Sequence, residues 1–178
     1  MIKLAVIHHQ FESIHPFYDG NGRTGRIINI LYLVLNGLLD LPILYLSGYI
    51  VKYKSEYYTR LQEVRDAQTR EARILYMLEA VDQTSRATTL MIKQIWGLMG
   101  EIKSLLKGKV TFYSKDCLEL LFKHPYTKIE FIAKELGVTR QTASKYLGEL
   151  EKMKILQSIS IGTDKYYINI KLYELFRK

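Results

Sequence analysis

Apolar residues near the start of the chain recur three or four positions apart, which is the spacing of one helical stripe. They are Leu4, Ile7, Phe11 and Ile14. Pro16 ends this predicted helix, because the residue before a proline is disfavoured in the helical region. A second helix is predicted from about Arg23 to Asn36-Gly37, a pair that is typical of a helix stop. Its aliphatic run over residues 27–35 is almost unbroken, so we expect this helix to be buried.

Further helices are predicted through the middle of the chain. Residues 38–46 are apolar, and Pro42 among them suits the first turn of a helix. Residues 47–64 place several tyrosines at helical spacing, and we expect most of them to pack with their hydroxyls at the rim of the core. The polar stretch 65–69 makes a break, after which a long helical pattern runs from about residue 70 to 106.

The last third of the chain changes its pattern. Ser114 can cap a short helix that ends near Lys123, and a second helix over 128–136 stops at a glycine. Thr139 can cap a third helix over 140–153, and alternating residues on either side of a Gly-Thr-Asp turn then predict a β-hairpin. This order of elements resembles a winged helix-turn-helix. The expected fold class is therefore mainly α, with a small α+β domain at the C-terminal end.

Composition bears on the cellular compartment in which the protein is expected. The chain has 178 residues, a formal net charge of +8 and a single cysteine, Cys117, which excludes an internal disulfide and fits a reducing compartment. The start of the chain lacks the pattern of a signal peptide. The apolar run over 27–35 is too short to cross a bilayer. We therefore expect a cytoplasmic protein without a membrane partner.

The stretch between the first two predicted helices concentrates polar and flexible residues. Gly20 and Gly22 allow close backbone approach, and the N–H groups at the start of the second helix form a favourable place for an anion. Arg23 and Arg26 follow three residues apart, so both guanidinium groups can reach the same side. A carboxylate beside them, Asp19, suits a hard cation such as Mg²⁺ shared with phosphate oxygens.

His15 adds a side chain of the type that titrates near neutral pH. Each feature has an ordinary structural explanation when taken alone: a Gly-Asn-Gly turn, a structural histidine, and solvated arginines on a helix. Their joint occurrence in twelve residues favours a site for phosphate and metal chemistry. The stretch is not a Walker A loop, because no Gly-Lys-Ser/Thr follows and no strand precedes it.

Residues 15–26 read HPFYDGNGRTGR and match, at every position, the HPFx(D/E)GNGRxxR signature of the Fic family (filamentation induced by cyclic AMP). The flanking sequence resembles that family over roughly residues 1–100. The resemblance implies a helical enzyme that transfers AMP from ATP, with Mg²⁺, to a hydroxyl side chain of a target protein. Relatives that resemble phosphate-transferring toxins have lysine where this chain has Gly22, so the glycine favours nucleotidyl transfer.

The resemblance also implies a role for each signature residue. His15 would deprotonate the attacking hydroxyl, and Asp19 would hold Mg²⁺. Arg23 and Arg26 would bind the outer phosphates, and Tyr57 falls where the family often places a nucleotide contact. The anion hole for the α- and β-phosphates would be formed by Gly20, Asn21 and Gly22.

In the Fic family, several helices and a β-hairpin flap precede the signature, which here begins at residue 15. We therefore expect residues 1–107 to be the C-terminal part of a Fic catalytic domain with a long linking helix. Residues 108–178 would be the winged helix-turn-helix domain. We expect this stretch to be inactive by itself and to associate into a homo-oligomer through its uncovered apolar helices.

The second part of the chain is the more basic one. Residues 101–178 carry 15 Lys and Arg against 9 Asp and Glu, or +6, whereas residues 1–100 carry 11 against 9, or +2. DNA binding would use the start of the third helix, where the exposed candidates are Arg140, Gln141, Thr142, Ser144 and Lys145. Only two of those 15 cations are arginine, which favours a protein-interaction module instead. The alternative function is a DNA-binding regulator with an incomplete or vestigial Fic half.

Overall fold

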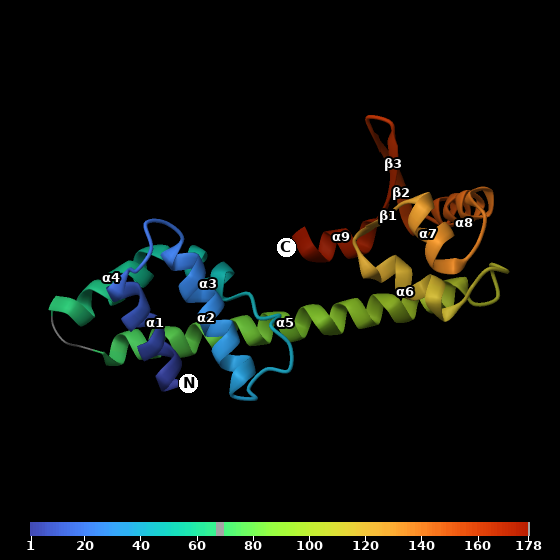
Figure 1. The fold of residues 1–178 in the computed structure, drawn as a ribbon. Helices are drawn as coiled ribbons and strands as arrows, with labels where there is room; N and C mark the ends of the chain where they lie inside the picture. Colours follow the sequence, from blue (N-terminus) through green and yellow to red (C-terminus); the bar gives the residue numbers. More distant parts are fainter. Residues whose placement is uncertain (67–69, 178) are drawn as a thin grey trace. The chain divides into compact units, whose positions relative to one another are not determined.

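The computed structural model describes residues 1–66 and 70–177, and the predicted break over 65–69 falls largely outside them. The chain divides into two compact units, Met1–Leu90 and Met91–Lys178. The fold is mainly helical with one small sheet, which confirms the predicted fold class (Figure 1). None of the described helices is both long and apolar enough to span a membrane.

The first unit is built around a pair of adjacent helices, α1 and α2, joined by the loop that carries the signature (Figure 1). The core between the helices of this unit includes Leu4, Leu33, Leu46, Met77 and Ala80, all at most 2% exposed. The helix bounds are α1 Ile2–Ile14, α2 Asn21–Leu35, α3 Leu46–Lys52, α4 Lys54–Asp66 and α5 Glu71–Leu106.

Two predictions for this unit are wrong. The aliphatic run of α2 is not buried as a whole, since Leu31 is 56% and Leu35 86% exposed. Only the stripe with Gly25, Asn29 and Leu33 is buried, because one face of a helix can contact α1 and the core while the other stays outside. The structure also has no helix over 36–45, where a short apolar run forms turns and irregular chain instead.

The second unit begins within α5, whose residues Leu98, Ile102 and Leu106 pack in its core. The division into residues 1–107 and 108–178 that the sequence suggests stays a prediction. The remaining elements are α6 Lys115–Lys123, β1 Tyr126–Thr127, α7 Ile129–Leu136, α8 Arg140–Lys152, β2 Leu156–Ile161, β3 Asp164–Asn169 and α9 Ile170–Arg177.

The predicted starts of α6 and α8 and the predicted end of α7 each have a cap in the structure. The Cys117 N–H donates to the Ser114 hydroxyl at 3.0 Å, and the Thr142 N–H donates to Thr139 Oγ1 at 3.2 Å. Gly137 ends α7 with a positive φ of 64°. The predicted caps of α6 and α8 and the glycine stop of α7 are therefore confirmed.

The three strands form one antiparallel sheet in the order β1-β3-β2, and the predicted hairpin is its β2–β3 part (Figure 1). Leu156, Tyr167 and Asn169 face the core of the unit, whereas Ile159 and Ile161 are 38% and 62% exposed. Alternation in the sequence predicts a strand but does not tell which of its two faces is covered.

Candidate functional site

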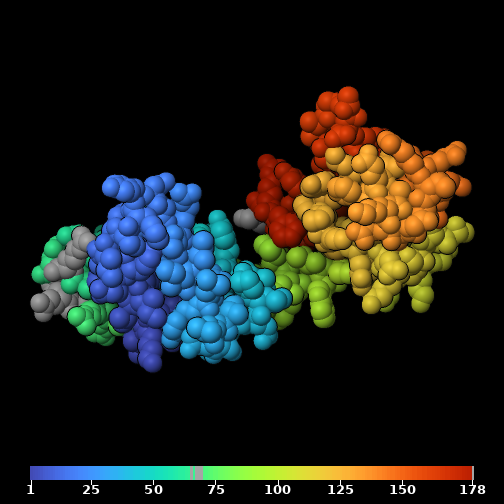
Figure 2. All heavy atoms as spheres, in the orientation of Figure 1, coloured from blue at the N-terminus to red at the C-terminus, as the bar shows by residue number. Residues whose placement is uncertain are grey.

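The signature loop starts from an unusual backbone position at His15. This residue ends α1 in the left-handed conformation, with φ 51° and ψ 56°, and its N–H donates to the Phe11 carbonyl at 3.1 Å. The left-handed cap turns the chain sharply out of the helix and leaves His15 exposed at the surface. The loop lies at the surface of the first unit (Figure 2).

Asn21 fixes the shape of the loop from inside. The Phe17 N–H donates to Asn21 Oδ1 at 2.9 Å, and Asn21 Nδ2 donates to the Phe17 carbonyl at 2.6 Å. Asn21 is 2% exposed whereas Phe17 is 51% exposed, so both bonds are partly buried. The Asn21 side chain therefore links the two ends of the loop, and its backbone begins α2.

The start of α2 presents N–H groups that have no intrahelical acceptor. Gly20 takes a φ of 86°, which favours glycine, and the Thr24 N–H donates to its carbonyl at 2.9 Å. The N–H groups of Asn21, Gly22 and Arg23 therefore precede the first hydrogen bond of the helix. Such a helix start, with its partial positive charge, suits an anionic group.

Charged side chains surround this helix start. Arg23 Nη2 donates to Asp19 Oδ2 at 3.0 Å, and Asp19 Oδ1 accepts from the Gly20 N–H at 2.6 Å. The ion pair is open to solvent, with side chains 72% and 90% exposed, so it can exchange for contacts with a ligand at small cost. Arg26 lies one turn further along α2 and is partly buried.

A buried layer beneath the loop was not identified from the sequence. His8 Nε2 lies 2.8 Å from the Tyr57 hydroxyl, and the Asn29 amide lies 3.1 Å from His8 Nδ1. Burial, with the nearby Arg73 charge, lowers the pKa of His8 to about 4, so the ring is neutral at pH 7. One sequence signal could have indicated this role: His8 follows the buried Leu4 by four residues, so both lie on the same face of α1.

Tyr57 belongs to this buried layer. It is 5% exposed, its hydroxyl faces His8, and burial raises its pKa. The Arg73 guanidinium lies 4.3 Å from the centre of its ring. The structure therefore places Tyr57 in the core of the unit, and its nucleotide contact stays a prediction.

Gly25 allows α1 and α2 to approach closely at the same level. A Cβ atom at this position would lie 2.6 Å from Glu12 Oε1 and 3.2 Å from the His8 ring. Gly25 is one of the unspecified positions of the signature, yet a side chain here would require Glu12 and the buried His8 ring to shift.

Among the described residues, no group of three or more His, Cys, Asp or Glu side chains could hold a metal ion. Asp19 offers a single exposed carboxylate beside the helix start. A Mg²⁺ ion that keeps several waters and takes phosphate oxygens needs only one or two protein carboxylates. The residues present thus fit a metal that arrives together with a nucleotide.

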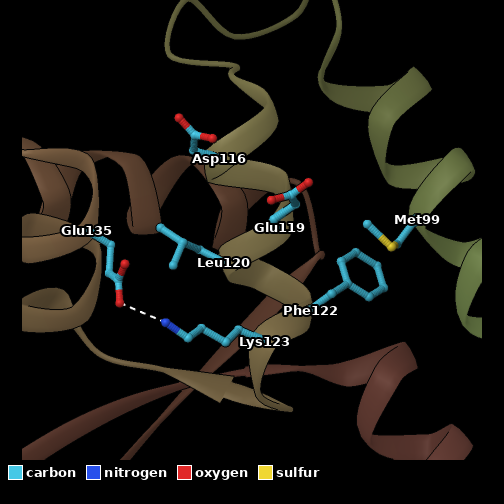
Figure 3. Close-up of a pocket in the computed structure, with 7 residues that line it drawn as sticks. All are labelled: Met99, Asp116, Glu119, Leu120, Phe122, Lys123 and Glu135. Carbon is cyan, nitrogen blue, oxygen red and sulfur yellow. Dashed lines mark hydrogen bonds and ion pairs between the residues drawn. The ribbon is translucent and has the colours of Figure 1, made fainter. Parts of the chain in front are cut away.

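The candidate DNA-binding residues occupy the start of α8. Arg140, Gln141, Ser144 and Lys145 are exposed, whereas the Thr142 hydroxyl lies 2.9 Å from Thr139 Oγ1 in the helix cap. They share no residue with a nearby cavity of about 470 Å³ in the same unit, drawn in Figure 3. Three of the seven residues that line this cavity are acidic, and its lysine, Lys123, is paired with Glu135 at 2.8 Å.

The structure thus defines a mainly helical protein whose candidate site is a glycine-containing loop at a helix start. Residues 1–33 match the Fic/DOC family, and residues 98–172 match the C-terminal domain of SoFic-like protein adenylyltransferases. The two matches lie in the order that the resemblance predicts, with the Fic-like stretch before the stretch similar to the SoFic-like C-terminal domain.

A search of curated proteins gives a similar result. The chain is 27% identical over 158 residues to a probable protein adenylyltransferase of Aquifex aeolicus. The match covers 88% of this chain but 45% of that relative, so the chain spans less than half of the relative's length.

Proposed function

We propose that the chain forms part of a protein adenylyltransferase that transfers AMP from ATP to a hydroxyl side chain of a target protein. The observation that carries the proposal is the pair of hydrogen bonds between Asn21 and Phe17, which holds the loop beside the unpaired N–H groups of α2. The family match and the Aquifex relative support the same reaction. ATP is the nucleotide substrate in this proposal.

The reaction forms one bond and breaks one. The hydroxyl oxygen of the target attacks the α-phosphorus of ATP, its proton passes to His15, and the bond from that phosphorus to pyrophosphate breaks. The first N–H groups of α2 hold the α- and β-phosphates, and Arg23 and Arg26 bind the outer phosphates. Asp19 would hold Mg²⁺, which neutralises phosphate charge when it is bound. For Tyr57 we retain the nucleotide contact that the family resemblance implies, although its side chain is 5% exposed and its hydroxyl lies 2.8 Å from His8 Nε2.

Labelled ATP tests this reaction in the natural polypeptide that carries these residues. We expect label from the α-phosphate, and not from the γ-phosphate, to appear on a protein hydroxyl. His15→Ala should lower the transfer by about 10²-fold or more and leave MgATP binding largely intact. His124→Ala, which removes an exposed histidine of the second unit, is the matched control. Unchanged transfer in His15→Ala, or transfer of the γ-label, would contradict the assignment.

For the second unit we propose an interaction module that selects a protein partner. DNA binding is the alternative function of this unit.

For the first unit we propose self-association through the exposed apolar side chains of α2, among them Ile27, Leu31 and Leu35. Light scattering should find a dimer or larger assembly of this chain at micromolar concentration. Leu31→Gln and Leu35→Gln together should shift it to the monomer, and a monomeric parent would contradict the proposal.

A further inference from the structure

A carboxylate oxygen of Glu12 lies in the contact between α1 and α2. This atom, Oε1, is buried and has no hydrogen-bond partner among the described residues. It lies 2.6 Å from the position that a Cβ atom on Gly25 would take, and 4.0 Å from that of a Cβ atom on Gly22. The two glycines are three residues apart on α2, so they share a face and together leave space for the carboxylate. A buried carboxylate oxygen without a hydrogen bond is unfavourable unless nearby positive charges compensate it.

The charged groups that act on Glu12 are positive. Burial raises the pKa of Glu12, and the charges of His15, Arg26 and Arg73 act in the opposite direction. Arg73 comes from α5 and is buried, whereas His15 and Arg26 belong to the signature. One carboxylate thus faces side chains of α1, α2 and α5 that carry or can gain a positive charge.

Arg26 is the signature residue that the structure brings closest to the same point as Glu12. Its Nη1 lies 3.2 Å from the position of a Cβ atom on Gly22, near which Glu12 Oε1 also lies. The guanidinium group and the carboxylate therefore converge on the first turn of α2. Arg26 is partly buried, whereas the Arg23 side chain is 72% exposed and already pairs with Asp19.

We propose that Glu12 is a positioning residue for Arg26. The carboxylate accepts a hydrogen bond from one edge of the guanidinium group while the other edge contacts the phosphates of the nucleotide. A guanidinium group has five N–H donors in one plane, so it can serve both acceptors at once. A fork held in one orientation loses less side-chain entropy when the phosphates bind, which favours binding. This inference rests on the proposed function, which assigns the outer phosphates to Arg26.

Neutralisation of Arg73 is the competing role for Glu12, and it is purely structural. It requires only the negative charge, whereas positioning of Arg26 requires the charge at the right distance. Glu12→Asp retains the charge and withdraws it by one methylene group, and Glu12→Gln retains the shape and removes the charge. A lost negative charge near bound phosphates would by itself tighten their binding. The two roles therefore predict opposite effects of Glu12→Gln on nucleotide affinity.

Calorimetric titration with MgATP, in the natural polypeptide that carries these residues, tests the proposal. We expect Glu12→Gln and Glu12→Asp each to weaken MgATP binding by about fivefold to tenfold, because Arg26 is no longer held. In an Arg26→Ala background the same changes should not weaken binding further, since there is no guanidinium group to hold. Glu79→Gln, which removes an exposed carboxylate of α5, is the matched control and should bind MgATP as the parent does.

The proposal is overturned if Glu12→Gln binds MgATP as tightly as the parent or more tightly. It is equally overturned if Glu12→Gln weakens binding as much in the Arg26→Ala background as in the parent, because Glu12 then acts without Arg26. Glu12→Asp, which keeps a negative charge near Arg73, decides by the same two criteria if Glu12→Gln does not fold.

Transfer of label from the α-phosphate of ATP, measured on the same proteins, separates this inference from the proposed function. In Glu12→Gln the KM for ATP should rise by a larger factor than kcat falls, because the lost contact serves nucleotide binding. A parent that binds MgATP but transfers no AMP would contradict the proposed function, and the binding criteria would still decide the role of Glu12. A parent that does not bind MgATP would contradict both.

Discussion

Asn21 and Phe17 are joined by two hydrogen bonds, one in each direction, of 2.9 and 2.6 Å. The amide of Asn21 thereby mimics a backbone pairing and satisfies both polar groups of Phe17 within a loop too short for regular structure. The loop is thus held in place before any ligand arrives, which reduces the conformational entropy that binding must remove.

Replacing Asn21 tests this role of the loop. Asn21→Ala should lower the free energy of unfolding by about 1 kcal/mol, because it leaves the partly buried N–H and carbonyl groups of Phe17 without their partner. Asn21→Asp keeps an acceptor for the Phe17 N–H and loses the donor to the Phe17 carbonyl. We therefore expect a lower free energy of unfolding for this variant too, together with weaker MgATP binding. Urea unfolding and calorimetric titration measure both effects. Asn36→Ala is the control, since its amide bonds the Tyr32 carbonyl at an exposed helix end.

Gly25 gives a second prediction, about packing beneath the loop. Gly25→Ala should destabilise the chain by about 1–3 kcal/mol, because its Cβ would lie 3.2 Å from the buried His8 ring, which hydrogen bonds hold on both nitrogens, as well as 2.6 Å from Glu12 Oε1. Gly97→Ala and Gly100→Ala, on α5, meet nothing within 4 Å and should stabilise it by about 0.5–1 kcal/mol each. Chemical unfolding of the three variants decides this, and equal effects at all three positions would contradict the close packing of α1 and α2.

The sequence predicts local structure in this chain better than it predicts burial. The caps at Ser114 and Thr139, the stop at Gly137 and the long helix α5 depend on neighbouring residues, so they can be read from the chain. The exposure of Leu31 and Leu35 on α2 depends on which other elements are present to cover them, and no local pattern contains that information.

In the candidate site too, some features follow from neighbouring residues and others only from packing. The residues of the signature lie together in the structure because they are neighbours in sequence. His8, Asn29 and Arg73, which form the buried layer, come from three different helices. Helical spacing accounts for the position of each residue on its own helix. Only the packed structure shows that His8 and Arg73 both contact Tyr57 and that Asn29 contacts His8.

The buried layer gives stability a defined dependence on pH. Burial lowers the pKa of His8 from 6.5 to about 4, so between these values the unfolded chain binds a proton that the folded chain does not. Stability from this residue is therefore complete above about pH 6.5 and is lost as the pH falls toward 4, by roughly 3 kcal/mol in all.

A variant isolates this contribution from that of other groups. Burial raises the pKa of Glu12, which acts in the opposite direction, and the charges of Arg73, Arg26 and His9 also face His8. His8→Gln retains hydrogen-bonding groups and removes the titration, so its unfolding free energy should depend less on pH between 4 and 6.5 than that of the parent. Equal pH dependence of the two proteins would show that His8 is not neutral in the folded chain.

The exposed start of α8 provides the last prediction, which concerns the ligand of the second unit. If it binds DNA, log K should fall linearly with log salt, with a slope of about −0.9 for each phosphate neutralised. Arg140→Gln should then relax sequence preference, and Lys145→Gln should weaken all sequences alike. We expect instead weak binding without sequence preference, because arginine is scarce here and the exposed tip of β2 carries Ile161 rather than a cation. Lys115→Gln on α6 is the control for general charge. Selection of one defined DNA motif by the chain at physiological salt, lost in Arg140→Gln and retained in Lys115→Gln, would contradict this expectation and make DNA the ligand.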